Sequence, residues 1–296
     1  MSQEYPSKNP SHEGMREAGG VMSLAQLLSP ITLIGNMRAN SSLVMQFSKR
    51  ELMAKNKGSS LGIVWTIAHP LIMLAVYTFV FAVVWQARWG VGEGESKAQF
   101  AISVFCGLIV FDVFASCVGP STSLIVYNSN FVKKVIFPLE VLPVSLLGAG
   151  LCVGAISTSI LLIANAVFNS KVSETMYMFP LVLIPLMAWT MGLSWLVASL
   201  GVYLRDLRQI VTGVLLPVFF FATPIFYPPE RVPEEFGWIV TWNPLAPVID
   251  ASRRTLLYGQ VPDWTALGVV TLAGLIVLQL GFAFFMKSKR SFADVL

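Results

Sequence analysis

Six long apolar runs divide the chain, and polar and charged residues gather in the segments between them. A helix needs about 20 apolar residues to cross a hydrocarbon core of roughly 30 Å. Because the runs are continuous and do not alternate, they favour helices over a barrel. The predicted fold class is therefore an all-α polytopic membrane protein. Its six transmembrane helices are expected at residues 63–87, 100–126, 141–168, 177–203, 210–226 and 264–286.

Composition and charge agree with this class. Apolar residue types make up 55% of the chain and charged residues only 12%, which is outside the range of ordinary soluble domains. Lysine and arginine flank the runs mainly on the side that also holds both termini, so the termini are predicted to be cytoplasmic. These flanks account for the net charge of +4, and no nucleic-acid partner is expected.

Motifs for nucleotide or metal chemistry are missing from the sequence. A phosphate-binding loop of the form GxxxxGK[ST] does not occur, and Lys57 precedes Gly58 where that motif needs the reverse order. The two histidines, His12 and His69, stand far apart and predict no metal site. Any ATP chemistry must therefore come from another polypeptide.

Two ionisable residues fall inside predicted spans. Asp112 lies midway along the second run, where it either lines a pathway or relays protons, or else forms local hydrogen bonds near the bend at Gly119-Pro120. His69 precedes Pro70 in the first run, where it either packs as a polar residue or acts as a general base. The sequence leaves both pairs of alternatives open.

Three polar stretches follow one another on the predicted cytoplasmic side. Residues 43–57 carry a weak amphipathic stripe, residues 127–143 combine apolar and basic side chains with Pro138 and Pro143, and residues 203–209 alternate in charge. Such stretches suit docking to a soluble partner, although lipid headgroups would also hold a basic turn.

The predicted outer connection, residues 227–263, contains apolar pieces that are too short to cross a membrane. Re-entrant or interfacial helices are expected there, one of them beginning near Ala246-Pro247. Within it, Arg253 and Arg254 either meet anionic lipid or polymer or extend towards headgroups.

Several motifs in one order resemble those of ABC-2 type membrane subunits that export polysaccharides, over roughly residues 38–290. The similarity is to the permeases of O-antigen, teichoic acid and capsule exporters. The N-terminal extension is not part of that pattern. The motifs are RELMAKNKGSSLGIVWTIAHPL followed by Tyr77 and Phe81, then NSNFVKKVIFPLEVLP, GVYLRDLRQIV, TPIFYPPERVP and WNPLAPVIDASRR.

The resemblance implies a homodimer bound to two copies of a separate ATPase subunit, which would hold ATP and Mg. The dimer would move a lipid-linked polysaccharide, O-antigen above all, across the bacterial inner membrane through a channel at the homodimer interface, and the chain itself would not be an enzyme. It implies a cytoplasmic tail at 1–40, an amphipathic interface helix at 41–60, a six-helix domain at 61–290 and a cytoplasmic end at 291–296. Within that domain it implies a coupling helix at about 128–137 and outer gate helices at about 228–258.

The candidate site residues fall into three groups. For coupling to the ATPase they are Arg50, Glu51, Lys55, Asn130, Phe131, Lys133, Lys134, Arg205 and Asp206. For the outer gate they are Tyr227, Trp242, Asn243, Arg253 and Arg254. Aromatic rings stack on sugar faces, so the candidates for a substrate channel are Tyr77, Phe81, Trp85, Phe111, Asp112 and Phe114.

Other functions remain open at this stage. Within the same class, the cargo could be a smaller lipid or a drug. A membrane acyltransferase would depend on His69, and a proton-coupled carrier would depend on Asp112. A carrier of that kind usually shows internal repeats, and the two halves of this chain show no convincing one.

Overall fold

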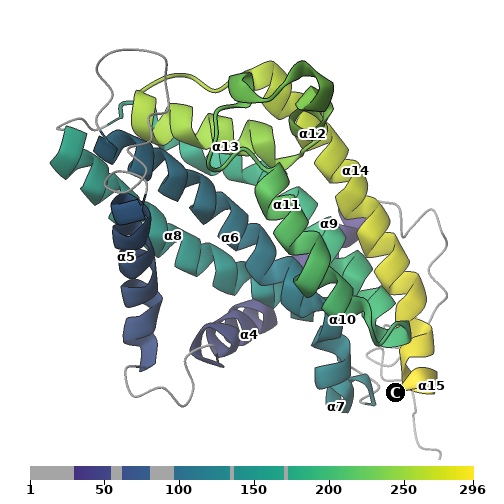
Figure 1. Cartoon of the computed structure of the whole chain (residues 1–296). Helices are drawn as coiled ribbons and strands as arrows, with labels where there is room; N and C mark the ends of the chain where they lie inside the picture. Colours follow the sequence, from purple (N-terminus) through teal and green to yellow (C-terminus); the bar gives the residue numbers. More distant parts are fainter. Residues whose placement is uncertain (1–29, 55–61, 81–96, 134–136, 170–172) are drawn as a thin grey trace, which may run out of the picture.

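A computed structural model describes residues 30–54, 62–80, 97–133, 137–169 and 173–296 (Figure 1). Within these ranges every regular element is a helix. Four helices are long and apolar enough to cross a membrane, which confirms the all-α membrane fold. They are α6 (Lys97–Tyr127), α8 (Val141–Asn169), α9 (Phe179–Tyr203) and α14 (Trp264–Ser288).

The first and fifth predicted spans correspond to shorter apolar helices, Trp65–Val80 and Leu207–Ala222. The described part of the first predicted span consists mainly of α5 (Trp65–Tyr77). The rest of that predicted span falls in residues 81–96, which lie outside the described residues. The fifth is built from α10 (Leu207–Ile210), a π-helical turn η6 (Val211–Leu215) and α11 (Leu216–Ala222). The count of six spans therefore stays a prediction.

Short helices make up most of the remaining described chain. Before the first span lie α3 (Pro30–Ala39), α4 (Ser41–Ala54) and η3 (Gly62–Val64). Between the long helices lie α7 (Ser129–Val132) and η5 (Met176–Met178). Before α14 come η7 (Pro229–Arg231), η8 (Glu234–Phe236), α12 (Gly237–Thr241), α13 (Leu245–Arg253) and η9 (Arg254–Tyr258). After it come η10 (Lys289–Ser291) and α15 (Phe292–Val295).

The core lies where α6, α8, α9 and α14 pack together, with α6 the most buried of the four and α14 the least. Trp195 of α9 is buried there against Phe282 of α14, with ring centroids 5.1 Å apart. The same two helices also meet backbone to backbone, because a Cβ added at Gly281 would overlap the carbonyl of Gly192. Small residues permit this close approach, as they do between many membrane helices.

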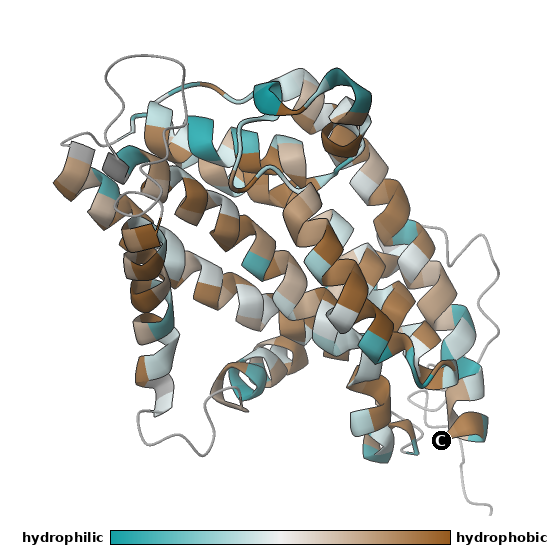
Figure 2. Ribbon diagram, viewed as in Figure 1, coloured by the Kyte–Doolittle hydropathy of each residue, from teal (hydrophilic) through white to brown (hydrophobic). Residues whose placement is uncertain are grey.

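The two ends of the bundle carry different short elements (Figure 1). α12 and α13 lie together at one end, here called the α13 end, whereas α4, α7 and α15 lie towards the opposite end, here called the α7 end. Figure 2 shows that the long helices between them are mostly hydrophobic. The predicted outer connection and the predicted cytoplasmic stretches therefore lie at opposite ends.

A partly buried ion pair joins distant parts of the chain at the α7 end. Lys289, just after α14, places its Nζ 2.7 Å from Oε2 of Glu140, just before α8. Glu140 is 5% exposed, and its carbonyl also accepts a hydrogen bond from the indole of Trp195. The following α15 is held by Phe292, which is fully buried against Phe285.

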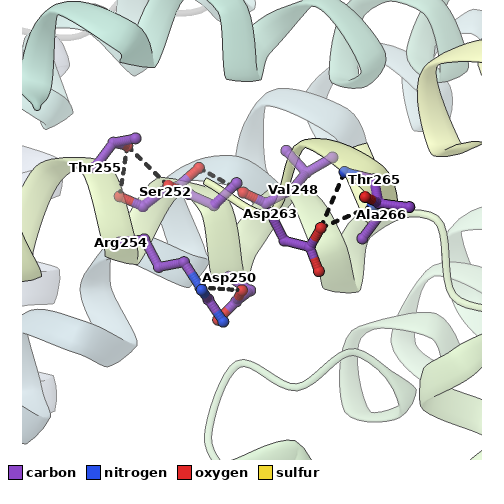
Figure 3. A network of polar contacts seen from close by, with 9 residues as sticks. Val248, Asp250, Ser252, Arg254, Thr255, Asp263, Thr265 and Ala266 are labelled. Carbon is purple, nitrogen blue, oxygen red and sulfur yellow. Dashed lines mark hydrogen bonds and ion pairs between the residues drawn. The ribbon is translucent and has the colours of Figure 1, made fainter. Parts of the chain in front are cut away.

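The outer connection folds into short helices, as expected from its interrupted apolar pieces. α13 begins at Leu245, close to the predicted Ala246-Pro247 start. The next long helix, α14, begins after Asp263, whose carboxylate accepts hydrogen bonds from the backbone amides of Thr265 and Ala266 (Figure 3). An aspartate at this position satisfies two of the free amides that every helix start exposes.

Candidate functional site

Three aromatic rings join α4 to the segment around α7. Phe47 of α4 lies 5.7 Å from Phe131 of α7 and 5.4 Å from Phe137, measured between ring centroids, and Phe131 stacks on Phe137 at 4.6 Å. We call these three residues the aromatic junction. Aromatic pairs at such distances add to the stabilisation from burial. Helices that lie about 80 residues apart in sequence are thus held together as one unit.

Arg50 of α4 packs its guanidinium against two rings of the aromatic junction. Its guanidinium carbon lies 4.3 Å from the ring centroid of Phe47 and 5.9 Å from that of Phe131, both within the range of cation–π attraction. The same guanidinium is 2.8 Å from Oε1 of Glu51 and 3.5 Å from the side-chain oxygen of Asn128. Three predicted coupling residues, Arg50, Glu51 and Phe131, therefore lie together.

A groove of about 940 Å³ runs between α4 and the adjoining ends of α6 and α10. We call it the basic groove, because Lys49, Arg50 and Arg208 outnumber its one acidic lining residue, Glu51. Tyr127 and Asn128 also line it. Arg208 donates a hydrogen bond to the hydroxyl of Tyr127, and its guanidinium carbon lies 5.6 Å from that ring centroid. The groove combines cations with exposed aromatic surface, which suits a protein partner with acidic groups.

The other predicted coupling residues are distributed differently. Asn130 and Lys133 are exposed on and just after α7, while Arg205 and Asp206 are exposed in the turn between α9 and α10 and do not line the basic groove. Lys55 and Lys134 lie outside the described residues. The candidate coupling residues do not include Phe47, Phe137, Tyr127, Asn128 and Arg208, although the implied coupling helix at 128–137 and the charged stretch at 203–209 cover three of them. Each of these residues lies in or beside one of the three polar stretches, which is the signal that the sequence offers. Their contacts with one another are long-range, so local pattern could not predict them.

A second hollow, the central cavity, lies between α5, α6, α8 and α11 and has a volume of about 450 Å³. Tyr77, Phe111 and Asp112, three of the predicted channel residues, line it. Its other polar or aromatic lining residues are His69, Phe105, Ser116, Ser157 and Phe220. Ring faces, hydroxyls and a carboxylate thus surround one space, and this mixture suits a sugar chain, whose faces are apolar and whose edges are polar.

Asp112 is exposed on α6, whereas its neighbours Phe111 and Val113 are buried. A carboxylate in the middle of a membrane-spanning helix is costly unless it faces a partner or water. Of the alternatives for Asp112, its place in the cavity lining favours a pathway residue. His69 lines the same cavity, so the fold brings together the two ionisable residues that the sequence leaves unconnected.

The remaining predicted channel residues do not line the central cavity. Phe114 is 3% exposed and packs in the core, 5.4 Å from Phe219 and 6.3 Å from Phe111 between ring centroids. The ring of Phe114 therefore packs against the ring of Phe111 within the core. Phe81 and Trp85 lie outside the described residues.

Arg253 at the α13 end is a correction to the sequence-based interpretation. Its side chain was expected to meet lipid, polymer or headgroups, but the residue is only 4% exposed. Its Nε donates to the carbonyl of Ser103 at 3.0 Å, and its two terminal nitrogens donate to the carbonyls of Pro224 at 3.0 Å and Ile225 at 2.8 Å. A guanidinium has five donors in a rigid plane, so one side chain can satisfy carbonyls from several segments.

Burial lowers the pKa of Arg253 from its ordinary value. Arginine starts from so high a pKa that the group remains charged in proteins. Charge-assisted hydrogen bonds to the three carbonyls offset part of the cost of burying it. Arg253 therefore joins α13 to α6 and to the turn after α11.

Two more of the predicted gate residues, Asn243 and Tyr227, lie around this turn. Asn243 donates from its side-chain nitrogen to the hydroxyl of Thr223 at 2.9 Å and accepts from the amide of Leu245 at 2.9 Å. The hydroxyl of Tyr227 donates towards the carbonyls of Phe221 and Ala222, each at 3.1 Å, and partial burial raises its pKa. Both residues fix the turn between α11 and the short helices.

Trp242 and Arg254 lie on the outside of the α13 end. Trp242 is 83% exposed, which is far more than a packed tryptophan would be. The Nε of Arg254 lies 2.7 Å from a carboxylate oxygen of Asp250, one helical turn earlier (Figure 3). Of the two adjacent arginines, only Arg254 can reach the surroundings of the protein.

Comparison with known proteins now decides the family. The family model for ABC-2 type transporters matches residues 42–257, a range that begins in α4, includes α7 and ends in η9. The chain belongs to the ABC-2 type transporter family. The aromatic junction, the central cavity and Arg253 of this ABC-2 chain all lie within the matched range.

Named relatives are similar over most of this ABC-2 chain. The O-antigen export system permease protein RfbA of Klebsiella pneumoniae is 29% identical, over 86% of this chain and 95% of the relative. The protein of the same name from Myxococcus xanthus is 27% identical, over 89% and 99%. The polysialic acid transport protein KpsM of Escherichia coli is 21% identical, over 82% and 92%.

Proposed function

We propose that this protein is the permease subunit of an ATP-driven exporter that moves a lipid-linked polysaccharide of the O-antigen type across the bacterial inner membrane. Its relatives include O-antigen export system permeases that match it over nearly their whole length. The active form in this proposal is a homodimer of the chain with two copies of a separate ATPase, and both termini are cytoplasmic.

The observation that carries the proposal is the union of α4 and α7 at one end of the bundle. In an exporter driven by a separate ATPase, some element of the permease must receive the motion of that subunit. The aromatic junction makes α4 and α7 a single lever, and the basic groove beside it offers cations to the partner. The α7 end is therefore cytoplasmic in this proposal.

The steps assigned to this chain are mechanical. ATP and Mg bind to the partner, whose closure pushes α7 and α4. The motion then passes to α6 and α8, which precede and follow α7 in the chain and which border the central cavity. The cavity offers aromatic rings and hydroxyls to the glycan, and weak, repeated contacts of this kind let a polymer slide. The chain itself catalyses no covalent step.

The test is to purify the protein from its native host in mild detergent and to identify what remains bound. An ABC-type ATPase and a sugar on a lipid carrier are expected in the complex, and deletion of the chain is expected to abolish the surface polysaccharide. Recovery of the ATPase together with only a small lipid or a drug would reject the polysaccharide cargo. Failure to recover an ATPase under conditions that preserve the dimer would reject the ATP-driven mechanism.

A further inference from the structure

The ion pair between Glu140 and Lys289 lies close to the aromatic junction along the chain. Glu140 follows Phe137 within one tight turn, in which the amide of Val141 donates to the carbonyl of Pro138 at 3.1 Å. Lys289 directly follows α14, and its Nζ lies 2.7 Å from Oε2 of Glu140. The pair therefore connects the lever formed by α4 and α7 with the last long helix.

Both partners of the pair are held by further contacts. The side chain of Glu140 is 6% exposed and that of Lys289 is 27% exposed. The backbone carbonyl of Glu140 accepts a hydrogen bond from the indole of Trp195 at 3.2 Å. On the other side, Phe292 is fully buried and its ring centroid lies 5.6 Å from that of Phe285 in α14. Neither charged group can shift far without moving the element that carries it.

The ion pair fixes a position more than it adds stability. Taking two charges out of water costs free energy that their attraction only partly offsets, and apolar residues often replace such pairs without loss of stability. The helix α14 is already held to α9 by the close contact at Gly192 and Gly281. What the pair adds is one defined position of the connection between α7 and α8 relative to α14.

We infer that Glu140 and Lys289 are positioning residues that pass the motion of the aromatic junction to α14, so that the push of the ATPase reaches the last span as well as α6 and α8. This inference rests on the proposed function, because it assumes that an ATPase drives the lever. Ion pairs and packed side chains carry coupling of this kind between distant elements. Glu140 lies inside the range that matches the ABC-2 family and Lys289 lies after it, so the family match does not describe this link.

The movement of α14 would not stay confined to that helix. Its backbone touches that of α9, where a Cβ added at Gly281 would overlap the carbonyl of Gly192. The indole of Trp189 in α9 also donates to the carbonyl of Val270 in α14 at 3.0 Å. The ion pair therefore gives the lever access to a second pair of long helices, on the side of the bundle away from the central cavity lining.

The test uses the complete transporter in vesicles of phosphatidylethanolamine and phosphatidylglycerol, with lipid-linked polymer extracted from the native host. The double variant Glu140→Gln with Lys289→Met removes both charges together, so it strands no carboxylate and keeps the net charge. Lys289→Arg is the matched control, since it keeps a cation opposite Glu140. The readout is the ratio of polymer-stimulated to basal ATP hydrolysis, because loss of folded protein lowers both rates together. Melting temperature and bound ATPase are measured alongside.

The double variant is expected to bind the ATPase and to melt within a few degrees of the wild type, while its ratio falls at least about threefold. Lys289→Arg is expected to keep the wild-type ratio. A wild-type ratio in the double variant, or an equal fall in Lys289→Arg, would overturn the inference and leave ATP-driven export intact. Loss of the ATPase from the double variant would overturn it as well, because the pair would then serve docking. A wild-type complex whose ATPase does not respond to the polymer would instead reject the proposed function.

Discussion

At the scale of single residues, Arg253 and Asp112 show two ways in which a helical membrane protein holds a charge. Arg253 is buried with three carbonyl partners from two other segments of the chain, α6 and the turn after α11, and so it acts as a structural residue. Asp112 is exposed and lines the central cavity, so its side chain is accessible from that space. The contrast follows from the donor geometry of the guanidinium, which lets one side chain satisfy several fixed backbone acceptors.

Replacing Arg253 with leucine is expected to destabilise the α13 end. The change removes three charge-assisted hydrogen bonds and leaves buried carbonyls with fewer partners, at a cost of about 3 kcal/mol. The melting temperature of the purified protein in detergent should fall by several degrees. The matched control is Arg254→Leu, which removes only a partly exposed pair with Asp250 that is worth less than about 0.5 kcal/mol. Equal melting temperatures for the two variants would contradict the structural role of Arg253.

At the scale of elements, α4 and α7 are too short to act alone. The helix α7 spans only Ser129–Val132, a single turn, and could not keep its position without neighbours. The aromatic junction supplies that support, and Arg50 adds a cation over the ring of Phe47. A push on either helix must therefore be shared by both.

Truncating Arg50 is expected to uncouple these two helices without removing either. Arg50→Ala loses a cation–π contact worth roughly 1 kcal/mol together with the bond to Asn128, so α4 and α7 should move more independently. Polymer-stimulated ATP hydrolysis by the complete transporter should fall at least about threefold while basal hydrolysis by the ATPase persists. Lys49→Ala serves as the control, because it removes a neighbouring cation of the basic groove from outside the aromatic junction. An equal loss of stimulated hydrolysis in both variants would contradict this role, because it would mean that the lost positive charge causes the defect and the contact between the two helices does not.

At the scale of the whole molecule, the features that could be predicted from the sequence are those that depend on consecutive residues, above all the positions of the long helices. Four long helices appear where apolar runs of sufficient length predicted them, because run length is a property of consecutive residues. The fate of Arg253 could not be predicted in this way, since its partner Ser103 lies 150 residues away. For the same reason, Phe114 was assigned to a channel although tertiary packing buries it behind Phe111.

The close contact between α9 and α14 leads to a prediction about the bundle as a whole. Gly281→Leu places a side chain where the carbonyl of Gly192 lies, so the two helices must separate. Forced separation of packed backbones should cost more than about 3 kcal/mol and reduce the amount of folded protein in the membrane. The control is Gly268→Leu on the same helix, where an added Cβ meets nothing within 4 Å. Similar yields and melting temperatures for both variants would show that this contact is not needed.

The ion pair between Lys289 and Glu140 has a consequence for how the protein can be handled. The residues after α14 are folded against the bundle, with Phe292 fully buried and Lys289 holding a carboxylate that is itself buried. Shortening the chain before Lys289 would strand that carboxylate beside the segment leading from α7 to α8. A purification tag or fluorescent protein fused here therefore belongs beyond Leu296 on a flexible spacer, because trimming this segment would disturb the same end of the molecule that is proposed to meet the ATPase.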